Sequence, residues 1–171
     1  MKKQNSMRDL KIVRVVLSAG ATGQDLEKAS KLLELVTDRK PQIVHSGPRK
    51  RIPAFGVKPN MPLGTNVTVR GEAAISLLNR ILGAIDNKLS EKQIKENTFS
   101  FGIKEYIDIP NMEYVREIGI RGFNVSVVFE RKGVRVKKKK IKRGKLPKRQ
   151  NVSKQEIIEY MKNKFNTEFE K

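Results

Sequence analysis

The sequence predicts an α+β fold in which an antiparallel sheet carries helices packed on one face. Segments with alternating apolar residues come in pairs, as hairpins require. Segments with the period of an amphipathic helix stand between and after these pairs. The resulting order is strand, helix, two strands, helix, two strands, helix. Strands paired through hairpins beside helices are typical of this class, and 171 residues suit a single domain over 1–171.

The first predicted strand covers residues 12–17, which are mostly β-branched and apolar. After a glycine-containing turn, residues 25–36 place five apolar side chains on one helical face. Pro41 prevents extension of this helix, and residues 42–45 predict a short strand. The apolar helix positions are Leu26, Ala29, Leu32, Leu33 and Val36.

Residues 46–64, SGPRKRIPAFGVKPNMPLG, predict a long, basic hairpin arm. Four prolines and three glycines in 19 residues argue against a helix, and alternation at 66–70 predicts the returning strand. Such an arm suits RNA, since phosphates bind the cations and an aromatic ring stacks on a base. Packing of Phe55 under its own loop is the alternative. The tip carries Arg49, Lys50, Arg51, Phe55 and Lys58.

The middle of the chain predicts a helix at 73–85, followed by a polar stretch at 86–98 without a clear pattern. Residues 99–110 alternate and predict a strand. In that register Glu105 falls on the apolar side, unless Gly102 marks a bulge that shifts the register.

The last predicted elements are a strand and a helix. Residues 123–129 alternate strictly between apolar and other residues, which makes this the clearest strand. Ser153-Lys-Gln-Glu156 is a capping box that opens a terminal helix through Phe165. A basic extension at 131–151 separates the two elements.

The net charge of +19 is concentrated in two acid-free segments. Residues 39–71 hold seven of the 37 Lys and Arg, and residues 131–155 hold 13, which leaves 17 bases against 18 acids elsewhere. A near-neutral scaffold with two cationic segments indicates phosphate neutralisation by defined elements. The alternative, a solvated charged surface, explains one short run better than two long segments.

The chain lacks the residue patterns of common catalytic and metal sites. It has no cysteine, which excludes disulfides and thiolate ligands, and its one histidine, His45, has no partner in the sequence for nucleophilic catalysis. We therefore expect no enzymatic activity, metal or cofactor. Without an apolar spanning run or a signal-peptide pattern, we expect a cytoplasmic protein that binds no membrane.

Several stretches carry a resemblance to a known family. They are RIPAFG at 51–56, MPLG at 61–64 followed by TVRG at 68–71, FSFGIKEYIDIP at 99–110, EIGIRG at 117–122, the basic run to Arg149 and the VSK start of the last helix. With them, the chain resembles the universal large-subunit ribosomal protein "L five" family in its archaeal and eukaryotic form. The resemblance covers essentially all of residues 7–165. The basic run before a terminal helix favours an archaeal source.

The resemblance implies a structural constituent of the large ribosomal subunit. Such proteins bind 5S rRNA and help anchor it in the central protuberance. They approach P-site tRNA with the hairpin arm and form an intersubunit bridge to a protein of the small-subunit head. The implied partners are thus 5S rRNA, 23S rRNA, P-site tRNA, that head protein and neighbouring 5S-associated ribosomal proteins.

The implied contacts fall into three groups. Those for 5S rRNA are Ser18, Gly20, Asn66, Thr68 and Arg70. Those of the arm, toward tRNA or 23S rRNA, are Arg49, Lys50, Arg51, Phe55 and Lys58. Those of the extension, toward rRNA, are Arg131, Arg135, Lys137, Lys138, Lys139, Lys140, Lys142, Arg143, Lys145, Lys148 and Arg149.

The first strand departs from the family pattern at two positions. Val16 stands where family members usually have Asn, and Ala21 stands where they have an acid. A polar contact to RNA is therefore missing there. Two other functions remain as alternatives: a free nucleic-acid-binding protein acting on DNA, and an RNA-modifying enzyme.

Overall fold

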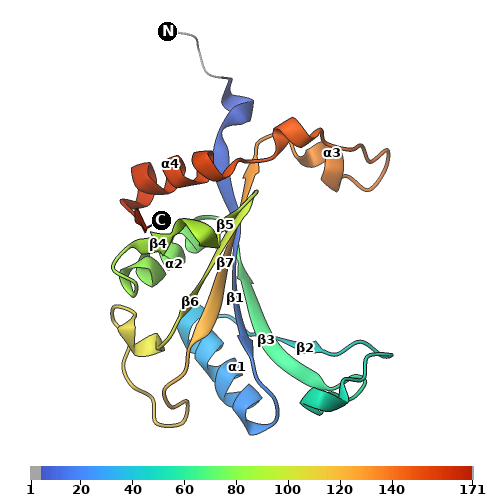
Figure 1. The fold of residues 1–171 in the computed structure, drawn as a ribbon, viewed down its shortest axis with the longest axis vertical. Coiled ribbons are helices and arrows are strands. Elements are labelled where there is room, and N and C mark those ends of the chain that lie inside the picture. Colours follow the sequence, from blue (N-terminus) through green and yellow to red (C-terminus); the bar gives the residue numbers. More distant parts are fainter. Residues whose placement is uncertain (1–4, 171) are drawn as a thin grey trace.

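A six-stranded sheet organises the computed structural model, which describes residues 5–170 (Figure 1). Each pair of neighbouring strands is antiparallel. The predicted fold class is therefore confirmed. In spatial order the strands are β2 (Gln42–His45), β3 (Pro62–Val69), β1 (Leu10–Gly20), β7 (Phe123–Arg131), β6 (Thr98–Ile103) and β5 (Ile94–Lys95).

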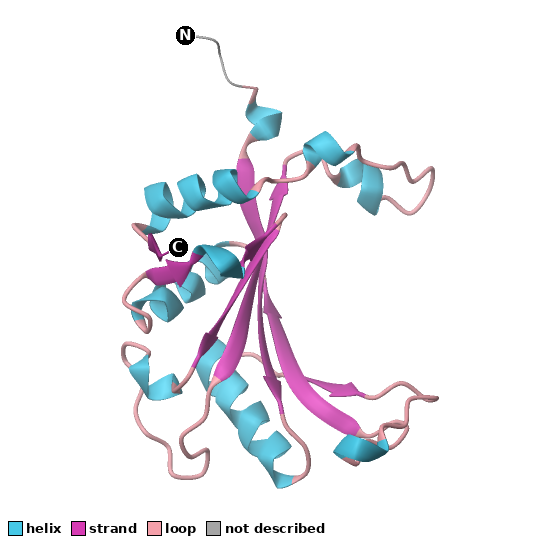
Figure 2. Ribbon diagram, viewed as in Figure 1, coloured by secondary structure: helices cyan, strands magenta, loops and turns pink. Residues whose placement is uncertain are grey.

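The three long helices lie on one side of this sheet (Figure 2). They are α1 (Gln24–Thr37), α2 (Glu72–Gly83) and α4 (Lys154–Phe165). A short helix, α3 (Arg135–Lys138), lies apart from them in the basic extension. Two further strands, β4 (Lys88–Ser90) and β8 (Glu168–Glu170), pair in parallel and hold the end of the described chain against the segment after α2.

Side-chain alternation decides which face of the sheet is covered. Val15, Leu17, Val125, Val127 and Phe129 are all fully buried beneath the helices. They join the apolar faces of α1, α2 and α4 in one contiguous core. Strand residues between them point to the opposite side, because successive side chains alternate across a sheet.

The strand predicted at residues 99–110 is shorter than expected. β6 ends at Ile103, and Tyr106–Asp108 forms a 3₁₀ turn, η4. A side chain at Gly122 would collide with the Ile103 carbonyl oxygen, so the chain turns away in close contact with the segment entering β7. Glu105 is consequently an exposed residue outside the strand, not a charge on the apolar face.

The predicted bulge also lies elsewhere. Gly102 pairs regularly with Asn124, whereas register shifts lie in β1, between Ile12 and Arg14, and in β2, between Val44 and His45. The polar stretch after α2 contains β4, a 3₁₀ turn at Glu91–Gln93 (η3) and β5. No periodic pattern spans this stretch because each element has only two or three residues.

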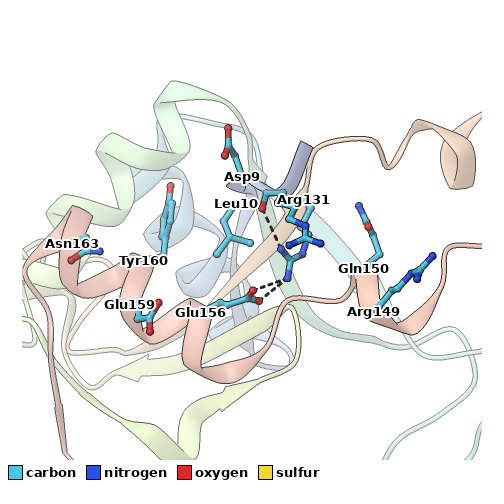
Figure 3. Close-up of a pocket in the computed structure, with 10 residues that line it drawn as sticks. Asp9, Leu10, Arg131, Arg149, Gln150, Glu156, Glu159, Tyr160 and Asn163 are labelled. Carbon is cyan, nitrogen blue, oxygen red and sulfur yellow. Dashed lines mark hydrogen bonds and ion pairs between the residues drawn. The ribbon is translucent and has the colours of Figure 1, made fainter. Parts of the chain in front are cut away.

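Arg131 ties the start of the terminal helix to the end of β7. Its Nη2 donates to both carboxylate oxygens of Glu156, each at 2.8 Å (Figure 3). Its two Nη groups also donate to the backbone carbonyls of Arg8 and Asn151, at 3.3 and 3.4 Å. The predicted capping box is present, since Ser153 N donates to Glu156 Oε2 at 3.0 Å and Ser153 Oγ accepts from Glu156 N at 3.4 Å. Arg131 is therefore a structural residue.

We predict that Arg131→Ala lowers the free energy of unfolding by about 2 kcal/mol, because Glu156 loses its charged donor. Burial raises the pKa of Glu156. The Ser153 backbone amide and the Arg131 guanidinium together have the larger, opposite effect, so the pKa lies below its ordinary value. A lowered carboxyl pKa stabilises the folded state above the pKa of the unfolded chain. The loss should thus be constant above about pH 5 and shrink below about pH 4.

Chemical denaturation across this pH range measures the difference. Arg135→Ala is the matched control, since Arg135 is exposed and its side chain makes no hydrogen bond or ion pair within residues 5–170. It should stay within about 0.5 kcal/mol of wild type. A loss in Arg131→Ala that persists undiminished at pH 3 would show that the ion pair is not its source.

Candidate nucleic-acid interface

The sheet face opposite α1, α2 and α4 carries short polar side chains. The strand registers place Ser18 between Asn66 on β3 and Asn124 on β7. One step along, Val16 lies between Thr68 and Ser126. Ser126 Oγ lies 2.9 Å from Ser100 Oγ on β6, and Gln42 on β2 pairs with Asn66 on the other side. We call this surface, formed by Gln42, Asn66, Thr68, Val16, Ser18, Asn124, Ser126 and Ser100, the polar face.

Four of the five residues expected to contact 5S rRNA lie on or beside this face. Asn66, Thr68 and Ser18 belong to it, and Gly20 ends β1 on the same side, opposite Gly64. Arg70 directly follows β3 and is exposed. The strand register brings these residues together.

Sequence reasoning missed the partners of these residues on other strands. Asn124, Ser126 and Ser100 were visible only as the polar positions of alternating strands. Their adjacency to Ser18 depends on which strands pair, which no local pattern shows. Hydroxyl and amide side chains both donate and accept hydrogen bonds, so the face matches the 2′-hydroxyls and base edges of an RNA minor groove.

The arm is a hairpin held in a fixed shape at its base. Ser46 is buried at this base. Its Oγ donates to the Lys58 carbonyl oxygen at 2.6 Å and accepts a hydrogen bond from Met61 N at 2.9 Å. At the tip, Ile52 and Val57 exchange backbone hydrogen bonds of 3.0 and 3.1 Å around a 3₁₀ turn, η2 (Pro53–Phe55).

Phe55 is 80% exposed at this tip. The alternative that it packs under its own loop is therefore wrong. Arg49, Lys50, Arg51 and Lys58 are exposed around it. An exposed ring among free cations can stack on a nucleobase while the cations neutralise phosphates.

The basic extension also folds back toward the end of β7. Gly144 N donates to the Val136 carbonyl at 3.1 Å, and Gln150 Nε2 donates to the Lys132 carbonyl at 3.4 Å, near the 3₁₀ turn η5 (Lys148–Gln150). Lys138 pairs with Glu130. The other expected cations of the extension are exposed: Arg135, Lys137, Lys139, Lys140, Lys142, Arg143, Lys145, Lys148 and Arg149. Arg131 differs, since its side chain is only 13% exposed and its charge is matched by Glu156.

A hollow lies beside Arg131, between the start of β1 and α4 (Figure 3). It measures about 770 Å³ and includes Asp9, Glu159 and Tyr160 in its lining. Among its charged residues, Arg131 pairs with Glu156 and Asp9 pairs with Lys132 at 3.0 Å. Within residues 5–170, no three acidic or histidine side chains are grouped to hold a metal ion. None of the helices in that range is long and apolar enough to cross a bilayer.

Comparison with known proteins identifies the family of this chain. Residues 62–160 match the model for the C-terminus of the ribosomal protein "L five" family. The large ribosomal subunit protein uL5 of Methanosphaera stadtmanae is 39% identical over 155 residues, which is 90% of this chain and 91% of the relative. The uL5 proteins of Sulfolobus acidocaldarius and Nanoarchaeum equitans are each 38% identical, over 96% and 92% of this chain and 93% and 94% of their own lengths.

We predict that Phe55→Ala weakens binding to a single-stranded oligoribonucleotide by about 1–3 kcal/mol, the range of base–aromatic stacking. The free energy of unfolding should change by less than about 0.5 kcal/mol, because the exposed ring supports no core. Fluorescence anisotropy and thermal unfolding measure the two effects.

Tyr114→Ala is the matched control, since Tyr114 is a 56% exposed aromatic outside the arm, in the segment before β7. It should bind the oligonucleotide as wild type does. Equal weakening by both variants would show that any exposed ring suffices and that the arm has no special part.

Proposed function

Because this chain belongs to the uL5 family of the large ribosomal subunit, and is thus a structural, non-enzymatic constituent of the cytoplasmic ribosome, we propose that it binds 5S rRNA and helps anchor it in the central protuberance. One observation carries the proposal. Four of the five residues that family resemblance assigns to 5S rRNA lie on or beside a sheet face that α1, α2 and α4 leave open.

Recognition on this face acts through shape and the sugar-phosphate backbone. Deep A-form major grooves exclude side chains, whereas the shallow minor groove presents 2′-hydroxyls to short polar groups. Asn66, Thr68 and Ser18 are such groups, held on paired strands. Arg70 adds a cation at the end of β3.

The arm and the extension account for the other proposed RNA contacts. The arm, with Phe55 exposed at its tip, is directed to P-site tRNA or 23S rRNA. The extension binds rRNA through its exposed cations. A bridge to a protein of the small-subunit head and contacts with neighbouring 5S-associated ribosomal proteins complete the partners that family membership supports.

DNA is the poorer ligand for the polar face, because duplex DNA has no 2′-hydroxyl to pair with Ser18, Thr68 or Ser126. We predict tighter binding of folded RNA than of duplex DNA of equal length at the same salt concentration. Competition binding measures the ratio. Equal affinities would favour a free nucleic-acid-binding protein.

We predict that the double variant Asn66→Ala, Thr68→Val weakens binding of a 5S rRNA transcript from Methanosphaera stadtmanae. Two lost hydrogen bonds between neutral groups correspond to about 1–3 kcal/mol, roughly 5- to 150-fold in affinity. The variant removes no charge, so the dependence of affinity on salt should keep its wild-type slope.

The control is Asn163→Ala, Ser76→Ala, which removes the same kinds of group from exposed positions on α4 and α2. It should bind the transcript normally. If both double variants bind as wild type does, the polar face does not contact 5S rRNA.

A further inference from the structure

We infer that the basic extension binds the same RNA as the polar face, through a phosphate-binding site that it shares with Arg14 and Arg70. We call Arg14, Arg70 and Lys137 the cationic end of the polar face. The inference rests on the proposed function and deepens it, since family membership leaves open which rRNA the extension binds. It names 5S rRNA as that partner and leaves the arm to a different RNA.

Two arginines are neighbours where the polar face meets the end of β3. Arg14 pairs with Val128 on the outward side of β7. Because Val15 pairs with Val69, the same register brings Arg70 beside Arg14. Both arginines are exposed, and neither forms an ion pair within residues 5–170. Like charges on neighbouring strands repel each other, and phosphates bound by the two guanidinium groups relieve that repulsion.

The extension folds against this end of the sheet. A hollow of about 170 Å³ is lined by Val128, the partner of Arg14, together with Lys137 of the extension. Backbone carbonyls that accept hydrogen bonds from Gly144 N and Gln150 Nε2 hold the extension there. The extension lies on the side of the sheet away from α1, α2 and α4 (Figure 1). Arg14 and Lys137 therefore both lie next to Val128, on the same side of the sheet.

The acid at this end of β7 is already paired. Glu130 lies opposite Lys11 on β1, and its carboxylate pairs with Lys138 of the extension. It therefore does not cancel the charges of Arg14 and Arg70. A solvated surface is the ordinary explanation of one exposed arginine. It does not explain two adjoining arginines without an acid while the outward acid of the next strand pairs with the extension.

The arm is too far away to share this site. It begins beyond the pair of Gly20 and Gly64, at the other end of β1. Arg14 lies six residues from Gly20, or about 20 Å at roughly 3.3 Å per residue, and the arm projects away from that end (Figure 1). A phosphate bound by Arg14 is therefore out of reach of the arm, whose cations stay available to tRNA or 23S rRNA.

The test removes two charges at a time from the full chain and measures binding of the Methanosphaera stadtmanae 5S transcript between about 50 and 200 mM salt. The strand variant is Arg14→Gln, Arg70→Gln, and the extension variant is Lys137→Gln, Lys139→Gln. The arm variant is Arg49→Gln, Lys50→Gln, and the control variant, on the exposed surfaces of α1 and α4, is Lys28→Gln, Lys162→Gln. Glutamine keeps a long polar side chain, and thermal unfolding verifies that each variant is folded.

The strand and extension variants should each flatten the log–log salt dependence by about 1.4–1.8 units, as expected for two lost phosphate contacts. The wild-type advantage over either variant then falls about 7- to 12-fold across this salt range. The arm and control variants should keep the wild-type slope. Hydroxyl-radical footprints should show the strand and extension variants losing protection at neighbouring nucleotides.

A charge-preserving variant, Arg14→Lys, Arg70→Lys, separates charge from structure. It should keep the wild-type slope, because both positive charges remain. A slope as flat as that of the glutamine variant would show that phosphate neutralisation is not the source of the effect, and would overturn the shared site.

Two results separate failure of the shared site from failure of the proposed function. If the extension variant keeps the wild-type slope, or the arm variant flattens it equally, the inference is wrong while 5S binding stands. If wild type binds the 5S transcript no better than an unrelated folded RNA, the proposed function is wrong. Footprints of the strand and extension variants on that unrelated RNA then decide the shared site, since neighbouring losses of protection support it and distant ones overturn it.

Discussion

The antiparallel register between β1, β3 and β7 is the constraint on which the molecule depends. Side chains in a strand alternate, so the register that buries Leu17 and Val125 is the one that turns Ser18 and Asn124 outward together. A shift by one residue would bury the polar row and expose the apolar one, at the expense of the whole core. Core packing thereby fixes the polar face, and no separate interaction has to specify it.

The cationic segments require fixed anchors because they repel themselves and each other. A charge of +19 disfavours a compact chain, and most of it lies in two loops that contribute little to the core. Each loop is held at its base by partly buried hydrogen bonds, through Ser46 in the arm and Arg131 beside the extension. Polyanion binding relieves the repulsion without moving the cations, so little conformational entropy is lost on binding.

Local pattern predicted the elements, and tertiary contact decided the exceptions. The alternation at 123–129 and the capping box at Ser153 suffice to predict β7 and α4. The end of β6 at Ile103 depends on close approach of Gly122, and the role of Arg131 depends on Glu156, which lies 25 residues away. Neither contact leaves a periodic signal. The same limit applies to the site, because the polar residues of each strand are visible in the sequence but their adjacency is not.

Val16 shows that the polar face and the cationic segments contribute differently to RNA binding. It lies half-buried between Thr68 and Ser126, where it offers no hydrogen bond. A face that relied on a few strong contacts would lose much of its affinity there. A face of many weak contacts beside cationic segments loses little, because phosphates supply most of the affinity and the face supplies fit. The departure at Val16 is thus compatible with RNA binding in this geometry, since a methyl-bearing side chain keeps the surface even where it cannot pair.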